Sequence, residues 1–181
     1  MRLAHLKKAE EPRPMSDSSR IEKPDLKQAT MMMPRRLQGI SGAQDPAIYS
    51  AAGRSNPARL TKAFGLACQC AQFSADAKAE NVLLLDMRKL TSVVDFFVIA
   101  TVPSRRQATG IAAQIEAEMK KRQEKKLSVE TSESGRWTLL DYGDIVVHLF
   151  SPEGRDFYSL DEVWGDAPRL DWTKPDQGHP E

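Results

Sequence analysis

Apolar residues recur at helical spacing in two segments of the chain. Between Pro57 and about Ala79 they fall on one helix face, and Asn56 followed by Pro57 is a typical helix start. After Ser104 the same spacing returns, and Gln107 three positions later completes a capping-box pattern. The pattern therefore predicts two amphipathic helices, each with one face directed at a core.

Short runs of strand-forming residues separate and follow these helices. They lie at 82–86, 95–102, 127–130, 136–141 and 144–150. The last two are joined at Tyr142-Gly143, where glycine supplies the positive φ that a two-residue hairpin turn requires. A short terminal helix is predicted at 155–164. This order predicts an α/β or α+β fold, with a mixed β-sheet of about five strands packed against helices.

The first 58 residues differ from the rest of the chain. They contain six prolines and no sustained apolar periodicity. They carry a net charge of +4, whereas residues 59–181 carry −3. We therefore expect a disordered extension at 1–58, a folded domain at 59–172 and a flexible tail at 173–181. A basic arm that touches RNA and a dispensable extension are the alternatives for the first segment.

Composition narrows the classes of function. The longest apolar run, 93–102, is interrupted by Asp95 and is too short to cross a bilayer, so we expect no membrane span. Cys68 and Cys70 are too closely spaced for a typical zinc site, and we expect no bound metal or cofactor. The scarcity of cysteine and the lack of a secretory signal in the first residues favour a cytoplasmic protein.

Four aspartates at predicted strand ends are the best candidates for an active site. Asp86, Asp95, Asp141 and Asp144 would allow two carboxylates to share a metal ion, as phosphoryl and nucleotidyl transfer require. The alternative is that they stabilise tight turns by accepting hydrogen bonds from nearby backbone N–H groups. A metal-dependent nucleotidyl or phosphoryl transferase therefore stays open as a second function.

Other catalytic arrangements fit the sequence poorly. A triad of Ser104, His148 and Asp141 would need the base beside the nucleophile, yet His148 lies inside an apolar run. The glycines form no nucleotide-binding fingerprint. Arg105 and Arg106 at a helix start could hold an anion, but simple exposure of both side chains is the preferred interpretation.

The second half of the chain is rich in aromatic residues, several of them in the hairpin WTLLDYGDIVVHLF. They are Trp137, Tyr142, Phe150, Phe157, Tyr158 and Trp164. Trp and Tyr dominate the binding energy of protein interfaces, and no convincing catalytic set accompanies them here. We therefore interpret the hairpin as a docking surface, with core packing as the alternative for Trp137 and Leu139.

Four segments together resemble the ribosomal silencing factor family, also called Iojap. They are KAENVLLLDMRKLTSVVDFFVIAT, SRRQATGIA, GRWTLLDYGDIVVHLF and RDFYSLDEVWGDAP, in the family's order and with similar spacing. The resemblance covers residues from about 61 to 172. The chain departs from the family pattern at Val102-Pro103, where a glycine is usual, and at 131–135.

The resemblance implies a translational repressor rather than an enzyme. It implies binding to the large ribosomal subunit through its ribosomal protein fourteen, so that joining of the small subunit is blocked and translation falls when nutrients are scarce. It also implies a nucleotidyltransferase-like topology without that activity, a homodimer of the free protein and, in organelle relatives, a role in large-subunit assembly. An incidental contact with ribosomal RNA is a further expectation.

Carried onto this sequence, the docking surface is predicted around the hairpin. The residues predicted to contact the partner are Trp137, Leu139, Tyr142, Asp144, Val146, Arg155 and Tyr158. Alternation along the first strand of the hairpin places Trp137, Leu139 and Asp141 on one face and Thr138 and Leu140 on the other. Either face is compatible with the docking interpretation.

Overall fold

The structure, a computed structural model, describes residues 56–175. Its elements are α3 (Pro57–Asp76), β1 (Glu80–Asp86), β2 (Phe96–Thr101), α4 (Arg105–Lys121), β3 (Ser128–Thr131), β4 (Trp137–Asp141), β5 (Ile145–Phe150), α5 (Pro152–Tyr158), α6 (Leu160–Val163) and β6 (Arg169–Leu170). Within the described part, the strands form one sheet in the order β3-β4-β5-β2-β1-β6. Only β2 and β5 pair in parallel. The predicted α+β class is confirmed, with one strand more than expected, while the nucleotidyltransferase-like topology stays a prediction.

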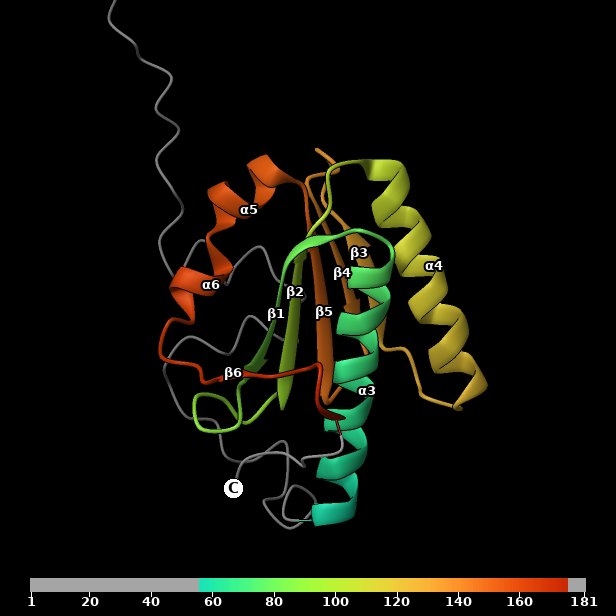
Figure 1. Ribbon diagram of the computed structural model, residues 1–181, viewed down its shortest axis with the longest axis vertical. Coiled ribbons are helices and arrows are strands. Elements are labelled where there is room, and N and C mark those ends of the chain that lie inside the picture. Colours follow the sequence, from blue (N-terminus) through green and yellow to red (C-terminus); the bar gives the residue numbers. More distant parts are fainter. Residues whose placement is uncertain (1–55, 176–181) are drawn as a thin grey trace, which may run out of the picture.

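The sheet has a hydrophobic core on each face, because successive residues of a strand point to opposite sides. Figure 1 shows α3 and α4 over one face and α5 and α6 over the other. In β5, Ile145 and Val147 belong to the core under α3 and α4, whereas Val146 and Phe150 belong to the core on the second face. Because helices cover both faces of the sheet, every residue of the central strands β2 and β5 is buried.

Helix α3 begins where the sequence predicts a helix start. The side-chain oxygen of Asn56 accepts a hydrogen bond from the backbone N–H of Ala58 at 3.0 Å, and Pro57 is the first helical residue. The start of α3 thus lies inside the segment 1–58 that was assigned to the extension. Residues 1–55 of that segment lie outside the described residues.

Helix α4 begins with half of the predicted capping box. The Ser104 hydroxyl accepts the backbone N–H of Gln107 at 3.2 Å, but the Gln107 side chain donates instead to the carbonyl oxygen of Ala77 after α3. Gln107 therefore also connects the start of α4 to the end of α3. Arg105 and Arg106 are exposed, as expected. Among the described helices, none is long and apolar enough to cross a membrane.

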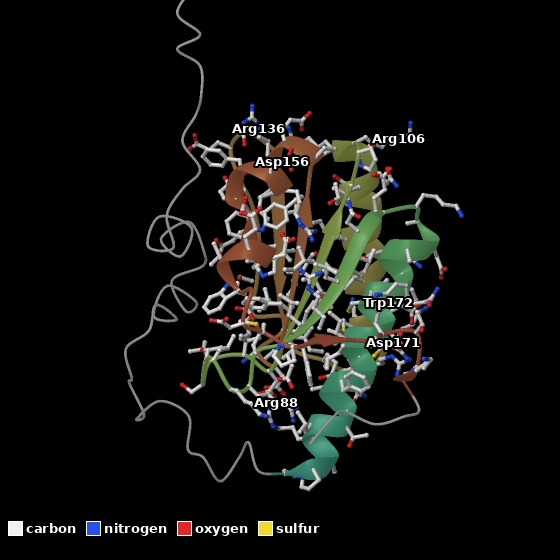
Figure 2. The ribbon with its side chains drawn as sticks, turned by 60° about the vertical axis from the view of Figure 1, so that its left-hand side comes forward. Arg88, Arg106, Arg136, Asp156, Asp171 and Trp172 are labelled. Carbon is white, nitrogen blue, oxygen red and sulfur yellow. The ribbon has the colours of Figure 1, made fainter. Side chains whose placement is uncertain are left out.

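The C-terminal segment adds a strand that the sequence analysis missed. β6 has only two residues, too few for a recognisable period, and it pairs with β1 at the edge of the sheet. Beyond it, Trp172 donates from Nε1 to the carbonyl oxygen of Val82 at 3.2 Å and packs beside the core under α3 (Figure 2). Of the predicted tail 173–181, residues 173–175 are described, and Thr173 donates its backbone N–H to Asp171 at 3.0 Å.

The terminal helix predicted at 155–164 is in fact two short helices. Ser159, between α5 and α6, has φ 43°, a left-handed conformation that ends the first helix. Gly154 in α5 lies against the β3–β4 connection, where a β-carbon would stand 2.3 Å from the carbonyl oxygen of Arg136. The same carbonyl accepts the backbone N–H of Ser151 at 2.9 Å. Glycine therefore permits the close contact that holds α5 in place.

Replacing Gly154 with alanine should lower the free energy of unfolding by about 1–3 kcal/mol, because the new methyl group must push α5 away from Arg136. Urea denaturation followed by circular dichroism measures the change. Gly110→Ala in α4 is the matched control, since no atom lies within 4 Å of the added β-carbon. The control should gain up to about 1 kcal/mol from helix propensity. A Gly154→Ala variant as stable as the wild type would contradict the tight contact.

Candidate functional site

The four candidate aspartates lie at one end of the sheet. Asp86 and Asp141 end strands β1 and β4, whereas Asp95 and Asp144 directly precede β2 and β5. The pairing register brings these ends together, because Asp86 stands opposite Phe96 and Asp141 opposite Val146. The sequence pattern thus located a real cluster of carboxylates at this end of the sheet. Which side chains bind these carboxylates decides whether they are free to hold a metal ion.

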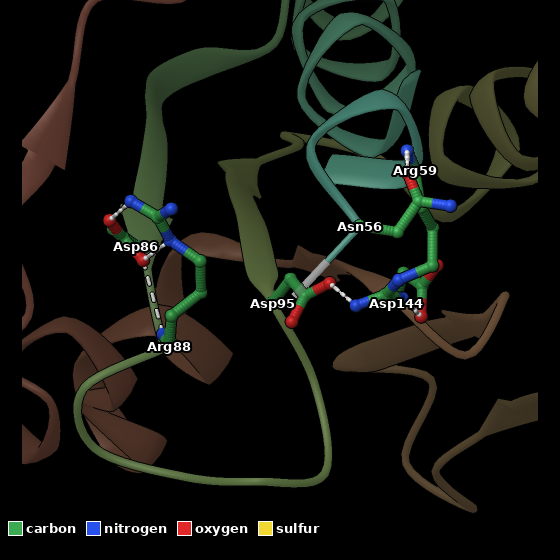
Figure 3. Close-up of polar contacts among 6 residues, drawn as sticks. All are labelled: Asn56, Arg59, Asp86, Arg88, Asp95 and Asp144. Atoms are coloured by element: carbon green, nitrogen blue, oxygen red, sulfur yellow. Dashed lines mark hydrogen bonds and ion pairs between the residues drawn. The ribbon is translucent and has the colours of Figure 1, made fainter. Parts of the chain in front are cut away.

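Arginine side chains engage three of these carboxylates (Figure 3). Arg59 of α3 places Nη2 2.7 Å from Asp95 and contacts Asp144 through Nη1. Asp95 is only 2% exposed, so the guanidinium offsets a charge that would otherwise be costly to bury. Arg88 binds Asp86 through two nitrogens, at 2.8 and 2.5 Å. Burial raises the pKa of Asp86, but the hydrogen bonds from Arg88 outweigh it, and the pKa lies below its usual range.

The fourth carboxylate stabilises the hairpin turn. Asp141 accepts the backbone N–H of Gly143 at 2.8 Å, and Gly143 has the positive φ, 88°, that the turn needs. Within residues 56–175, no group of three or more His, Cys, Asp or Glu side chains is arranged to hold a metal ion. A metal ion bound by Asp86, Asp95 or Asp144 would have to displace Arg59 or Arg88. The arrangement therefore favours the turn-stabilising interpretation over the transferase.

The Ser104, His148 and Asp141 triad is not assembled. Ser104 caps α4 and Asp141 accepts a bond from the hairpin turn. His148 lies inside β5, fully buried, and its Nδ1 accepts the indole N–H of Trp137 at 3.2 Å. Each member has a separate structural role, so these three residues do not place a nucleophile beside a base.

Three of the residues predicted to contact a partner lie in buried strands. Trp137 is 5%, Leu139 2% and Val146 0% exposed. Core packing, the alternative interpretation for Trp137 and Leu139, therefore describes their position, because both point into the core of the second face. The hairpin as a whole is an inner part of the sheet rather than a free surface.

Two further predicted contact residues hold α5 and α6 on this face. Arg155 is nearly buried and donates from Nε to Asp161 at 2.9 Å. Tyr158 packs its ring on Trp137 with 4.9 Å between ring centroids. Arg155 thus joins α5 to α6, and Tyr158 packs α5 on β4, so replacing either one would disturb the fold as well as any interface.

Tyr142 and Asp144 are the only predicted contact residues with partly exposed side chains. They lie at the hairpin turn, near Arg59, and line a hollow of about 80 Å³ between the turn and the ends of α3 and α4. Burial of the Tyr142 ring raises the pKa of its hydroxyl above the usual value. The structure thus divides the predicted contact set between two ends of the hairpin.

At the other end of the hairpin, nearly buried residues form the floor of a larger open hollow. The hollow measures about 440 Å³ and lies over β3 and β4. Its lining comprises Trp137, Leu139 and Tyr158 on the floor and Glu130, Thr131, Ser132, Glu133 and Ser134 along the β3–β4 connection. This size is typical of sites that enclose a ligand or a partner's side chains. We call it the β3–β4 hollow.

The acidic residues of the β3–β4 hollow were missed by sequence reasoning. Glu130 is exposed in β3, and Glu133 follows in the connection. Glu130 faces the hollow because it stands opposite Leu139 in the ladder. No motif marks these two residues. The pairing of β3 with β4 is needed before their position beside Trp137 becomes visible.

The described residues thus form an α+β domain with an apolar hollow, an acidic rim and no assembled catalytic set. A sequence model for the family described as ribosomal silencing factor during starvation, RsfS, matches residues 61–181. The chain belongs to this RsfS/Iojap family. The resemblance drawn from four sequence segments is confirmed.

Individual relatives agree with this assignment. The ribosomal silencing factor RsfS of Bacillus subtilis is 38% identical over 96 residues, covering 53% of this chain and 81% of the relative. The chloroplastic protein Iojap of Arabidopsis thaliana is 33% identical over 119 residues, covering 66% of this chain and 50% of the relative. A crystal structure of a Chromobacterium violaceum protein, 33% identical, aligns with a TM-score of 0.52 over 59% of this chain and 86% of its own.

His148 is the buried ionisable group beneath the floor of the β3–β4 hollow. Its ring stacks on Trp137 at 5.7 Å and meets the edge of Phe97 at 4.7 Å between centroids. Burial lowers the pKa of His148 to about 3, and the nearby charge of Arg155 acts in the same direction. The neutral imidazole is therefore the form that accepts the Trp137 N–H.

The free energy of unfolding should decrease as the pH falls below about 6.5. The unfolded chain binds a proton on His148 near that pH, whereas the folded protein binds it only near pH 3. Between the two values the unfolded state holds more protons, so acid favours unfolding by up to about 1.4 kcal/mol per pH unit. Urea denaturation of wild type and His148→Gln from neutral pH to about pH 4.5 measures this. The variant should show the shallower dependence, and parallel curves would contradict the assignment to His148.

Proposed function

We propose that this chain binds the large ribosomal subunit through its ribosomal protein fourteen and blocks joining of the small subunit. The observation that carries this proposal is the match of residues 61–181 to the ribosomal silencing factor family. The mechanism is occlusion, which requires affinity and bulk but no catalytic step. Translation then falls as more of the protein occupies large subunits, and nutrient limitation is the condition in which we expect this.

The β3–β4 hollow is our candidate for the surface that contacts protein fourteen. Its floor of Trp137, Leu139 and Tyr158 is apolar and aromatic, the composition typical of interface centres. Its rim carries Glu130 and Glu133. A protein that binds ribosomal RNA presents Lys and Arg side chains that neutralise phosphates. Some of these cationic side chains can pair with an acidic rim. The burial of the floor residues also means that the site is preorganised.

The rim allows a test that leaves the core intact. With purified ribosomal subunits on sucrose gradients, the wild-type protein should travel with the large subunit and reduce the peak of joined ribosomes. Glu130→Lys with Glu133→Lys should weaken this binding about tenfold or more, because attraction to a basic partner becomes repulsion. The control is Glu80→Lys with Asp166→Lys, the same change of charge at exposed positions that do not line the hollow.

The outcomes separate the role from the site. A wild-type protein that stays at the top of the gradient would overturn the silencing role. Binding that both double variants retain equally would leave the role standing and remove the hollow as the contact. Trp137→Ala is less informative, because removing a buried aromatic side chain costs about 3–5 kcal/mol of stability by itself.

A nucleotide-binding measurement addresses the transferase alternative. Because Arg59 and Arg88 already engage the carboxylates, we expect no saturable binding of ATP with magnesium in isothermal titration calorimetry. Asp86→Asn should lower stability, since Arg88 loses its charged partner, without changing binding to the large subunit. Saturable binding that Asp86→Asn abolishes would restore the transferase.

The remaining expectations belong to the same proposal. We expect a cytoplasmic location, although the plant relative from Arabidopsis thaliana bears a name that places it in the chloroplast. A homodimer of the free protein and an incidental contact with ribosomal RNA stay predictions. Light scattering of the purified full chain, with and without large subunits, would test the dimer.

A further inference from the structure

Strand β3 lies at one edge of the sheet, and its outer side has no neighbouring strand among residues 56–175. It pairs with β4 on its inner side only. Two large apolar side chains are exposed here: Leu127 is 46% exposed and Val129 is 37% exposed. An unpaired edge strand is a template for another strand, and exposed apolar residues increase that tendency.

The register shows which backbone groups of β3 point outward. Ser132 donates its N–H to the carbonyl oxygen of Trp137 at 2.9 Å, just beyond the strand. Val129 stands opposite Leu140, and Thr131 stands opposite Thr138. Hydrogen-bonded and non-hydrogen-bonded pairs alternate along an antiparallel ladder. Val129 and Thr131 therefore form non-hydrogen-bonded pairs with β4. Their backbone N–H and C=O groups point away from β4.

The outward edge continues into the β3–β4 hollow. Glu130 points to the sheet face on which Leu139 forms part of the floor of the hollow. A strand added beside β3 would lie about 4.8 Å away, and every second side chain would point to that same face. Such side chains would stand beside Glu130 and reach toward Trp137. Backbone pairing and side-chain burial would thus come from one segment.

We propose that β3 accepts an extended segment of the partner protein as an additional strand of the sheet. The segment carries an apolar side chain that enters the β3–β4 hollow and a basic side chain that pairs with Glu130 or Glu133. This inference rests on the proposed function, because it describes how protein fourteen would be held. Backbone pairing gives affinity, and the hollow and its acidic rim give specificity.

The acidic rim argues for a basic partner rather than a second copy of this chain. Antiparallel pairing of two β3 strands would bring Glu130 and Glu133 of both copies to one seam, where like charges repel. A basic segment meets opposite charges at the same positions. Self-pairing is nevertheless one outcome that the following test detects.

Amide hydrogen exchange tests the strand addition without any substitution. The full chain is mixed with isolated ribosomal protein fourteen, and exchange is followed by NMR at single amides. The N–H groups of Val129 and Thr131 should exchange about tenfold more slowly, or slower still, in the complex. Binding without such protection would overturn the inference while the silencing role stands. Absence of binding to protein fourteen would overturn the proposed function and this inference together. Protection that grows with the concentration of this chain alone would assign the edge to a second copy and also overturn it.

A pair of substitutions at one position separates backbone from side chain. Val129→Pro removes an outward N–H that β4 does not use, and proline is tolerated at such edge positions. Val129→Ala keeps the N–H and removes most of the side chain. The proline variant should bind protein fourteen about tenfold more weakly, and the alanine variant less than about threefold, with folding checked by circular dichroism. Equal weakening by both would contradict strand addition. If the proline variant does not fold, the exchange measurement on the wild type decides.

Discussion

The parallel pairing of β2 with β5 is the constraint on which the rest of the structure depends. Six consecutive residue pairs join these strands, from Phe96 with Ile145 to Thr101 with Phe150. A parallel pair requires a crossover, and here the crossover contains α4, β3 and β4. The crossover helix covers one face of the sheet together with α3. The returning strands extend the sheet beyond β5 and leave β3 at its edge.

The two faces of the sheet are therefore covered unequally. On one face α3 and α4, of 20 and 17 residues, cover a continuous core. On the other, α5 and α6 have only seven and four residues, and the hollow remains open over β3 and β4. Buried contacts make its floor rigid, including the Trp137 indole bonded to the neutral His148. A rigid floor of this kind loses little conformational entropy when a partner binds.

The carboxylates at the opposite end of the sheet show how similar residues can serve structure instead of chemistry. Arg59 connects the first turn of α3 to the starts of β2 and β5 through Asp95 and Asp144. Arg88 holds Asp86 at the end of β1. A cation supplied by the protein itself occupies the positions where a transferase would need a metal ion. Arg59 thereby links the starts of two parallel strands to α3, whereas the Arg88 contact stays within residues 86–88.

Local patterns were sufficient to predict the long helices, the buried strands, the hairpin turn at Gly143 and the α+β class, because periodicity and capping act between near neighbours. Family membership also followed from the sequence, since it rests on the order and spacing of several segments. The two-residue β6 has no period to detect, and the left-handed conformation of Ser159 breaks a segment whose residue pattern predicts one helix. Which hairpin residues are buried, and that Glu130 stands beside Leu139, depended on strand pairing between distant segments. Tertiary packing alone decided these features, because burial and register arise from contacts that no local pattern encodes.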